Sequence, residues 1–260
     1  ISVAADHRYW NSPDEMQNHL GRSLPKPLRL ASADAKRFLD DELFFRYADN
    51  RFLEFFRASE NELTEKDKRT FRKLLRQIIK VIGGGRDVRL VDKSQSFALK
   101  IPYLEALIGD CRPYYLVVTR HPYAICCREA RKKYPDGLPR SEYLRCLTRR
   151  AEHWNNTFRV ISEDTAKLVD SNRVYWVRIE DVLANPVDEM RNVFKFCDLH
   201  FSESYLPQPN DRFFFKHTAD AKWYPIRKDP NGKYIEKMTN EEKETIRNVC
   251  GAQMEQLKYY

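Results

Sequence analysis

Three short apolar runs of the 260-residue chain, at residues 88–91, 114–119 and 174–177, are each followed directly by charged residues. The charged groups are Asp92-Lys93-Ser94, Arg120-His121-Pro122 and Arg178-Ile179-Glu180-Asp181. If the runs are strands of one parallel sheet, these groups lie at the same sheet edge, where open α/β sheets bind their ligands. Lysine and arginine at such an edge bind phosphate or sulfate through charge-assisted hydrogen bonds. The sequence therefore predicts a site for an anionic ligand.

Arg120 is the strongest single candidate in this pattern. It stands just before Pro122, and proline is favoured in the first turn of a helix. Free backbone N–H groups, the helix dipole and the guanidinium group then converge on one place, which favours a bound phosphate. The alternative is an ion pair at the sheet edge, and the residue alone does not decide between the two.

Alternating strands and helices must position these groups. The apolar, β-branched runs at 114–119 and 174–177 are typical of strands buried on both faces. Thr64 is a candidate N-cap, three consecutive glycines end the helix that it starts, and Thr239 with Glu242 forms a capping box. Such alternation predicts a parallel sheet with helices on its faces. We expect helices over residues 34–57, 64–82, 98–108, 122–132, 140–169, 186–197 and 239–259, and an extended loop over 205–235.

Composition narrows the possible functions. With 42% hydrophobic and 32% charged residues the chain is typical of a globular protein, and it contains no apolar stretch long enough to span a membrane. The net charge of +8 favours polyanionic partners, but the basic clusters are short and mixed with acids, unlike a nucleic-acid-binding arm. Six cysteines without a C-x-x-C pair argue against zinc or thioredoxin-like chemistry. The compartment, cytoplasm or Golgi lumen, stays open.

Five segments, in this order, resemble motifs of sulfotransferases that use 3′-phosphoadenosine-5′-phosphosulfate (PAPS). The segment DKS at 92–94 with LKIPYL at 99–104 is similar to the family's EKTP…LRIPYL. The others are YLVVTRHPYA at 115–124, VRIEDVLANP at 177–186, AKWYP at 221–225 and the closing segment at 250–259. They resemble hhhhVRDPxxA, VRYEDLxxxP, xKWxP and C…m..lgY. The carbohydrate-type and tyrosylprotein sulfotransferases are the most similar groups.

The resemblance implies a fold and an activity. The fold would be α/β, a P-loop-NTPase-like three-layer arrangement with a central parallel sheet flanked by helices, built as one domain over residues 1–260. The activity would be transfer of a sulfuryl group from PAPS to a hydroxyl or similar acceptor, with PAP as the product and no metal. The acceptor, a glycan, a peptide tyrosine or a small molecule, stays open, and neither nucleic acid nor a membrane span is expected.

The resemblance also implies roles for individual residues. Lys93 matches the lysine that contacts the 5′-phosphosulfate, and it would also stabilise charge on the leaving oxygen. Arg120 matches the arginine that binds the 3′-phosphate, and Lys222 matches a late lysine that reaches the nucleotide phosphates. Asp6-His7-Arg8 resembles a Glu-x-Arg motif, so that Asp6 would be the general base, with His7 as the alternative.

The sequence departs from the family pattern in two places. A P-loop-like segment, PRSGTT, is expected well before Asp6, and the chain begins at Ile1 without it. We expect that the first strand and this loop were left out of the chain, the alternative being a degenerate copy. Arg128 stands where the family has a serine that binds the 3′-phosphate. Arg128 could take over that phosphate, or it could point to solvent with Glu129.

Two other functions fit parts of the pattern. A non-catalytic, sulfotransferase-like binding domain would explain the missing loop and Arg128. A P-loop nucleotide kinase would need a Walker lysine and a Mg²⁺-binding serine or threonine upstream of Ile1. The residues encoded before Ile1 distinguish the three possibilities: PRSGTT supports sulfuryl transfer, GxxxxGK[ST] supports a kinase, and neither supports a binding domain.

Overall fold

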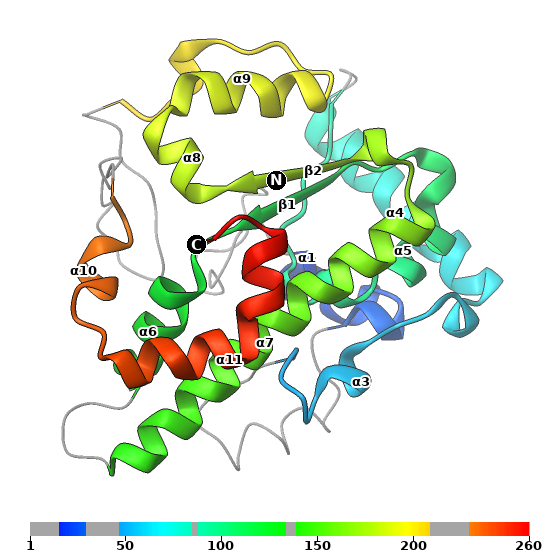
Figure 1. Cartoon of the computed structure of the whole chain (residues 1–260). Helices are drawn as coiled ribbons and strands as arrows, with labels where there is room; N and C mark the ends of the chain where they lie inside the picture. Colours follow the sequence, from blue (N-terminus) through cyan, green and yellow to red (C-terminus); the bar gives the residue numbers. More distant parts are fainter. Residues whose placement is uncertain (1–15, 30–46, 85–87, 134–138, 209–228, 260) are drawn as a thin grey trace, which may run out of the picture. The chain divides into compact units, whose positions relative to one another are not determined.

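A computed structural model describes residues 16–29, 47–84, 88–133, 139–208 and 229–259 (Figure 1). The chain divides into two compact units. The first unit comprises Ile1–Phe45, Phe56–Pro113 and Arg212–Tyr224, and the second comprises Arg46–Phe55, Tyr114–Asp211 and Pro225–Tyr260. We describe each unit by itself. None of the described helices is long and apolar enough to cross a membrane.

The first unit is helical in its described part and packs around a small apolar core that includes Leu28, Phe71 and Tyr103. Thr64 caps α4 through its hydroxyl group, which accepts a hydrogen bond from the backbone N–H of Asp67 at 3.1 Å. Gly84 ends this helix in the left-handed conformation, with φ of 55°, which glycine adopts without steric cost. The predicted cap and stop signals are thus confirmed. The elements are α1 (Met16–Leu20), α4 (Glu65–Gly83), α5 (Ile101–Ile108) and the 3₁₀ turns Gly21–Ser23, Lys26–Leu28, Glu60–Glu62, Gln95–Leu99 and Gly109–Cys111.

The second unit is built on a two-stranded parallel sheet. Strand β1 (Tyr115–Thr119) pairs with β2 (Val174–Arg178) so that Thr119 lies opposite Arg178. The residues that follow the two strands therefore lie at the same edge, as predicted. In Figure 1, α6, α8 and α10 lie at the arrowhead ends of both strands. The helices are α3 (Leu53–Phe56, at the boundary of the units), α6 (Pro122–Lys133), α7 (Arg140–Leu168), α8 (Ile179–Ala184), α9 (Pro186–Phe196), α10 (Gly232–Ile235) and α11 (Asn240–Gln256).

Helices pack on both faces of this sheet. On one face, the ring of Phe158 from α7 lies 6.3 Å from that of Trp176 in β2. On the other face, Phe196 of α9 contacts Tyr175 at a centroid distance of 5.2 Å. The predicted α/β fold, with parallel strands between helices, is confirmed in this unit. The prediction that β1 is buried on both faces was wrong, because Leu116 and Val118 remain 41% and 55% exposed.

The predicted strand at residues 88–91 was also wrong. The segment has no regular secondary structure and pairs with no strand in the described part of the chain, and Val91 is 65% exposed. The residues after it bind a helix instead of closing a strand. Asp92 accepts a hydrogen bond from the backbone N–H of Met16 at 2.6 Å, and Ser94 accepts one from that of Gln17 at 3.2 Å. The segment's polar end therefore serves to cap α1.

The predicted helix at 34–57 was wrong over residues 47–52, which form turns before the short α3. The cause is Asp49, which is fully buried. Its carboxylate accepts hydrogen bonds from the backbone N–H of Arg51 at 3.0 Å and from the guanidinium group of Arg51 at 2.6 Å. Such local side-chain bonds compete with helical hydrogen bonds. Residues 30–46 lie outside the described residues.

Candidate functional site

Arg120 lies at the carboxyl end of β1, and groups from two other segments hold it there. Its Nε donates to Oδ1 of Asn231 at 3.0 Å, and its Nη2 donates to the carbonyl oxygen of Pro230 at 2.7 Å. The indole Nε1 of Trp154 in α7 donates to the backbone carbonyl of Arg120 at 3.0 Å. Both the backbone and the side chain of Arg120 are therefore fixed in place by hydrogen bonds.

Glu180 connects the segments around Arg120. It lies in the first turn of α8, directly after β2. Its Oε1 accepts hydrogen bonds from the backbone N–H of His121 at 2.8 Å and from Nδ2 of Asn231 at 2.6 Å. Its Oε2 accepts one from the hydroxyl group of Tyr259 at 3.2 Å. One carboxylate thus joins the residue before α6, the turn before α10 and Tyr259, the third residue after α11.

Tyr259 contacts residues at the ends of both strands. It is 4% exposed, and its hydroxyl group lies 2.7 Å from Oγ1 of Thr119 in β1. Its ring lies 5.2 Å from the ring of His121, and the guanidinium carbon of Arg178 lies 5.6 Å from its centroid. Burial raises the pKa of this tyrosine above its ordinary value, so the hydroxyl group stays protonated and can donate to Glu180.

The N-terminus of α6 offers an anion fewer donors than the sequence predicts. Pro122 has no N–H group, the N–H of His121 is bound by Glu180, and the N–H of Tyr123 donates to Nδ1 of His121 at 3.2 Å. Burial lowers the pKa of His121 while Glu180 raises it, and the net effect is a pKa below the ordinary value. His121 is therefore a neutral acceptor here. An anion at this place depends on guanidinium groups more than on the helix backbone.

Arg128 lies on α6 and carries the second guanidinium group of this region. Burial lowers the pKa of Arg120, and the positive charge of Arg128 lowers it further, while Glu180 raises it. The two cations are thus close enough to repel each other. Arg128 itself forms an ion pair with Glu129 at 2.7 Å, and its side chain is 40% exposed. The structure thus shows Arg128 paired with Glu129, and its binding of the phosphate stays a prediction.

The other predicted site residues lie in the first unit or outside the described residues. Lys93 is an exposed residue of the first unit, between the capping residues Asp92 and Ser94. Asp6, His7 and Lys222 lie outside the described residues. Arg120 and Arg128 thus both belong to the second unit, just before α6 and within it, and for Lys93 the structure gives only the local setting.

Comparison with known proteins decides the family. The sequence model of the Sulfotransferase family matches residues 11–203, well over half of the chain. The chain belongs to the sulfotransferase family. Among solved structures, it is similar to the "Sulfotransferase Domain from the Curacin Biosynthetic Pathway", with 16% identity and a TM-score of 0.48 over 72% of this chain and 68% of that one. None of the curated proteins matches.

Two residues of the candidate site, Asn231 and Tyr259, lie beyond residues 11–203, the range that the family model matches. Sequence reasoning gave neither of them a role. Tyr259 was part of a family-like closing segment without a role, and Asn231 fell in a predicted extended loop. A local signal for the second existed, because Asp229-Pro230-Asn231-Gly232 is a typical turn sequence. Oδ1 of Asp229 accepts hydrogen bonds from the N–H groups of Asn231 and Gly232, both at 2.8 Å. The hydrogen bonds from the N–H groups of Gly232 and Asn231 lower the pKa of Asp229.

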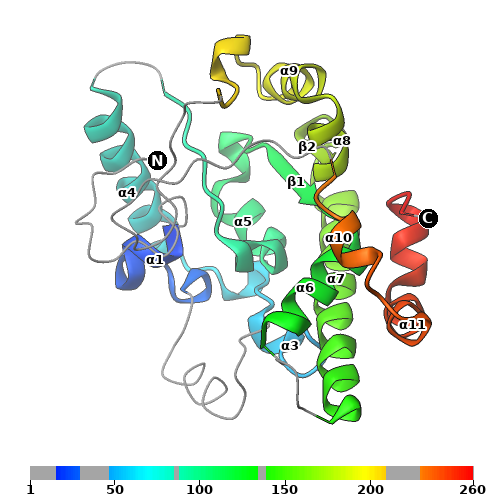
Figure 2. The same ribbon diagram turned by 90° about the vertical axis from the view of Figure 1, so that its left-hand side faces the viewer.

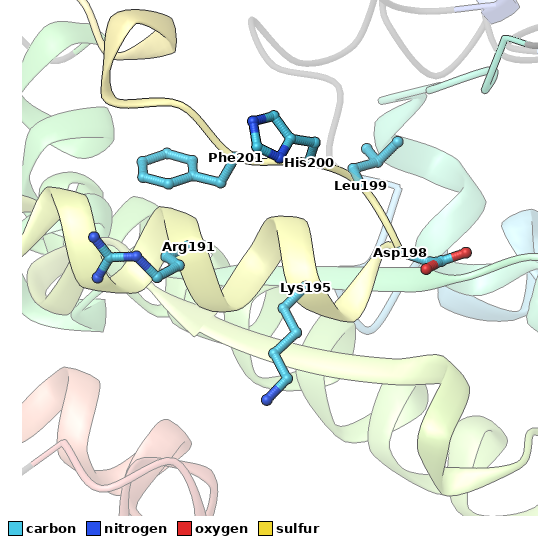
Figure 3. Close-up of a pocket in the computed structure, with 6 residues that line it drawn as sticks. All are labelled: Arg191, Lys195, Asp198, Leu199, His200 and Phe201. Atoms are coloured by element: carbon cyan, nitrogen blue, oxygen red, sulfur yellow. The ribbon is translucent and has the colours of Figure 1, made fainter.

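A shallow surface hollow lies in another part of the second unit, between α9 and residues 198–201 (Figure 3). Arg191 already pairs there with Asp188 at 2.6 Å and lies 5.7 Å from the ring centroid of Phe201. In Figure 3 the side chain of Lys195 points away from His200 and Phe201. The two cations of the hollow, Arg191 and Lys195, therefore do not point toward one place.

Figure 2 shows the second unit from another side, and in this view too α10 lies near the tip of β1.

Proposed function

We propose that this sulfotransferase uses PAPS as its donor and transfers the sulfuryl group to a hydroxyl-bearing acceptor, a glycan, a peptide or a small molecule. One observation carries the proposal. Arg120 stands at the carboxyl end of β1, where open α/β sheets bind ligands, and the guanidinium group of Arg128 acts on it electrostatically. Two neighbouring cations of this kind suit the doubly charged 3′-phosphate of PAPS.

The electrostatics of the pair support an anionic ligand. A partly buried guanidinium group that also faces a second cation is destabilised, which is the meaning of the lowered pKa of Arg120. An anion bound between the two groups removes this repulsion and forms charge-assisted hydrogen bonds with both. The ion pair between Arg128 and Glu129 is partly exposed, so solvent weakens it and a phosphate can replace it.

The remaining roles in the proposal concern the transfer itself. Sulfuryl transfer in line leaves negative charge on the oxygen that departs with the phosphate, and we assign Lys93 to stabilise that charge. Asp6 removes the acceptor proton, with His7 as the alternative. Lys222 contacts the nucleotide phosphates. In this proposal lysine and arginine supply the positive charge, and residues 1–260 act as one domain.

A second candidate function is nucleotide binding without transfer. It would explain why Arg128 stands where the family has a serine that binds the 3′-phosphate. Such a domain would bind PAP and transfer nothing. The two candidates therefore differ in turnover and agree in binding.

Transfer from radiolabelled PAPS to a panel of hydroxyl acceptors tests the proposal on the full-length protein. We expect labelled product with the wild type and strongly reduced product with Arg120→Ala. Arg191→Ala, in the hollow beside α9, serves as the matched control and should leave transfer unchanged. Binding of PAP without labelled product on any acceptor would favour the second candidate, and absence of PAP binding would contradict both.

A further inference from the structure

We propose that Glu180 is a positioning residue for the nucleotide site, acting on Arg120 through the side-chain amide of Asn231. The inference rests on the proposed function, in which Arg120 binds the 3′-phosphate. It assigns Glu180 no contact with the nucleotide. Its task is to set the direction in which the guanidinium group points.

The relay depends on the two ends of the Asn231 amide. Its Nδ2 donates to Oε1 of Glu180 at 2.6 Å, while its Oδ1 accepts from Nε of Arg120 at 3.0 Å. An amide donates only from nitrogen and accepts only at oxygen. A carboxylate accepts only, so it forces the amide nitrogen toward itself and the amide oxygen toward Arg120. Without the carboxylate, the amide is free to turn and present N–H groups to a cation.

Burial makes this choice of orientation matter. Asn231 is 6% exposed, so water does not readily replace a lost partner of its amide. A buried donor or acceptor without a partner costs more than an ordinary hydrogen bond contributes. The same oxygen of Glu180 also holds the backbone N–H of His121, the residue next to Arg120. Glu180 thus fixes both the neighbouring backbone and the side-chain partner of Arg120.

The carboxylate orients Arg120 without neutralising it. The described ion pairs include none between Glu180 and Arg120, because the three hydrogen bonds of Glu180 go to His121, Asn231 and Tyr259. A direct ion pair would compete with a phosphate for the guanidinium group. An uncharged amide between the two groups keeps the positive charge available to a ligand.

Four variants of the full-length protein, three single and one double, test the relay, with the affinity for PAP measured by calorimetry. We expect Glu180→Ala to weaken binding about tenfold, the order expected for the loss of one hydrogen bond to a charged group. Glu180→Gln retains an oxygen for His121 and Asn231, so it should bind within about twofold of the wild type. Asn231→Ala should lose as much as Glu180→Ala, and the double variant no more than either single one.

Two controls separate positioning from a general loss of structure. Asp188→Ala removes the exposed ion pair with Arg191 in α9 and should leave PAP affinity unchanged. In an Arg120→Ala background, Glu180→Ala should cause no further loss of affinity, because the group on which it acts is gone. Thermal unfolding of each variant shows that the protein tested is folded.

The outcomes distinguish this inference from the function on which it rests. A wild type that does not bind PAP contradicts the proposed function and the inference with it. A wild type that binds PAP and loses affinity in Arg120→Ala, but not in Glu180→Ala or Asn231→Ala, contradicts the inference alone. An equal loss from Glu180→Ala with and without Arg120 also overturns it. If Glu180→Ala does not fold, Asn231→Ala and its double variant with Arg120→Ala decide the matter in the same way.

Discussion

Oδ1 of Asn231 lies 3.0 Å from Nε of Arg120, although 111 residues separate the two along the chain. The neighbouring carbonyl oxygen of Pro230 accepts from Nη2 of the same arginine. The turn at 229–232 therefore holds the cation that follows β1. This contact makes the geometry of the turn part of the proposed nucleotide site.

Gly232→Ala is expected to weaken PAP binding severalfold by disturbing this turn. A Cβ atom at Gly232 would lie 2.2 Å from Oδ2 of Asp229, so the carboxylate must rotate away. It then gives up its bonds to the N–H groups of Asn231 and Gly232. Calorimetry with PAP measures the effect.

Gly251→Ala, within α11, is the matched control. A Cβ atom there would have its nearest neighbour, Cγ of Arg247, 3.9 Å away, so the change should stabilise the helix by about 0.5–1 kcal/mol. If Gly232→Ala binds PAP as tightly as the wild type, the geometry of the turn at 229–232 does not affect the nucleotide site.

Tyr259→Phe is expected to lower the free energy of unfolding by about 1–3 kcal/mol. The change removes the hydroxyl group that bonds Thr119 and Glu180, and it leaves the buried Thr119 hydroxyl group without this partner. Urea denaturation followed by circular dichroism measures the loss. Tyr205→Phe removes the hydroxyl group of a tyrosine that is 59% exposed and should cost much less. Equal losses in the two variants would contradict the account of Tyr259.

His121 is expected to make stability depend on pH below its ordinary pKa of 6.5. Burial lowers the pKa of this histidine in the folded protein, although Glu180 opposes the shift. The unfolded chain therefore binds more protons than the folded one as pH falls. The stability that neutral His121 contributes is fully present above pH 6.5 and is lost as pH falls toward the folded pKa.

Urea denaturation at about pH 8 and about pH 5.5 checks this dependence. His121→Asn keeps an acceptor for the N–H of Tyr123 and cannot take up a proton, so the stability of this variant should fall less between the two values. His200→Asn, at an exposed position, should behave as the wild type. A wild type and a His121→Asn variant with the same pH dependence would show that His121 titrates alike in both states.

Arg128→Ala is expected to weaken PAP binding by about three- to tenfold, because it removes the second cation beside Arg120. Glu129→Gln removes the ion-pair partner and leaves this cation in place, so binding should be equal to or tighter than that of the wild type. Both variants should change the free energy of unfolding by no more than about 1 kcal/mol, because solvent screens this partly exposed ion pair. Unchanged affinity in Arg128→Ala would mean that this arginine only pairs with Glu129.

Local signals in the sequence were sufficient for much of the second unit. Three of these signals depend on only a few consecutive residues: the apolar runs of β1 and β2 and the capping box of Thr239 and Glu242. The structure confirms all three. Arg120 could be predicted for the same reason, because its place depends only on the strand before it and the helix after it. The segment at 88–91 carried a similar apolar pattern, but a strand also needs a partner, and that condition is not local.

The partners of Arg120 could not be predicted in this way. Asn231 and Tyr259 reach the end of β1 from positions 111 and 140 residues further along the chain than the residues that they contact. Glu180 was recognised as a charged residue after a strand, but its three hydrogen bonds depend on how α6, the turn and the chain after α11 come together. Likewise, the burial of Asp49, which replaces part of a predicted helix by turns, is a tertiary effect.

The affinity of the full-length protein for PAP, measured by calorimetry for the wild type and Arg120→Ala, tests the central claim most directly. We predict binding by the wild type and a loss of about 1.5–3 kcal/mol in the variant, the contribution of a hydrogen bond to a charged group. Arg191→Ala should bind as the wild type does. Equal affinity of wild type and Arg120→Ala, or no binding of PAP by either, would contradict the assignment of the 3′-phosphate to the end of β1.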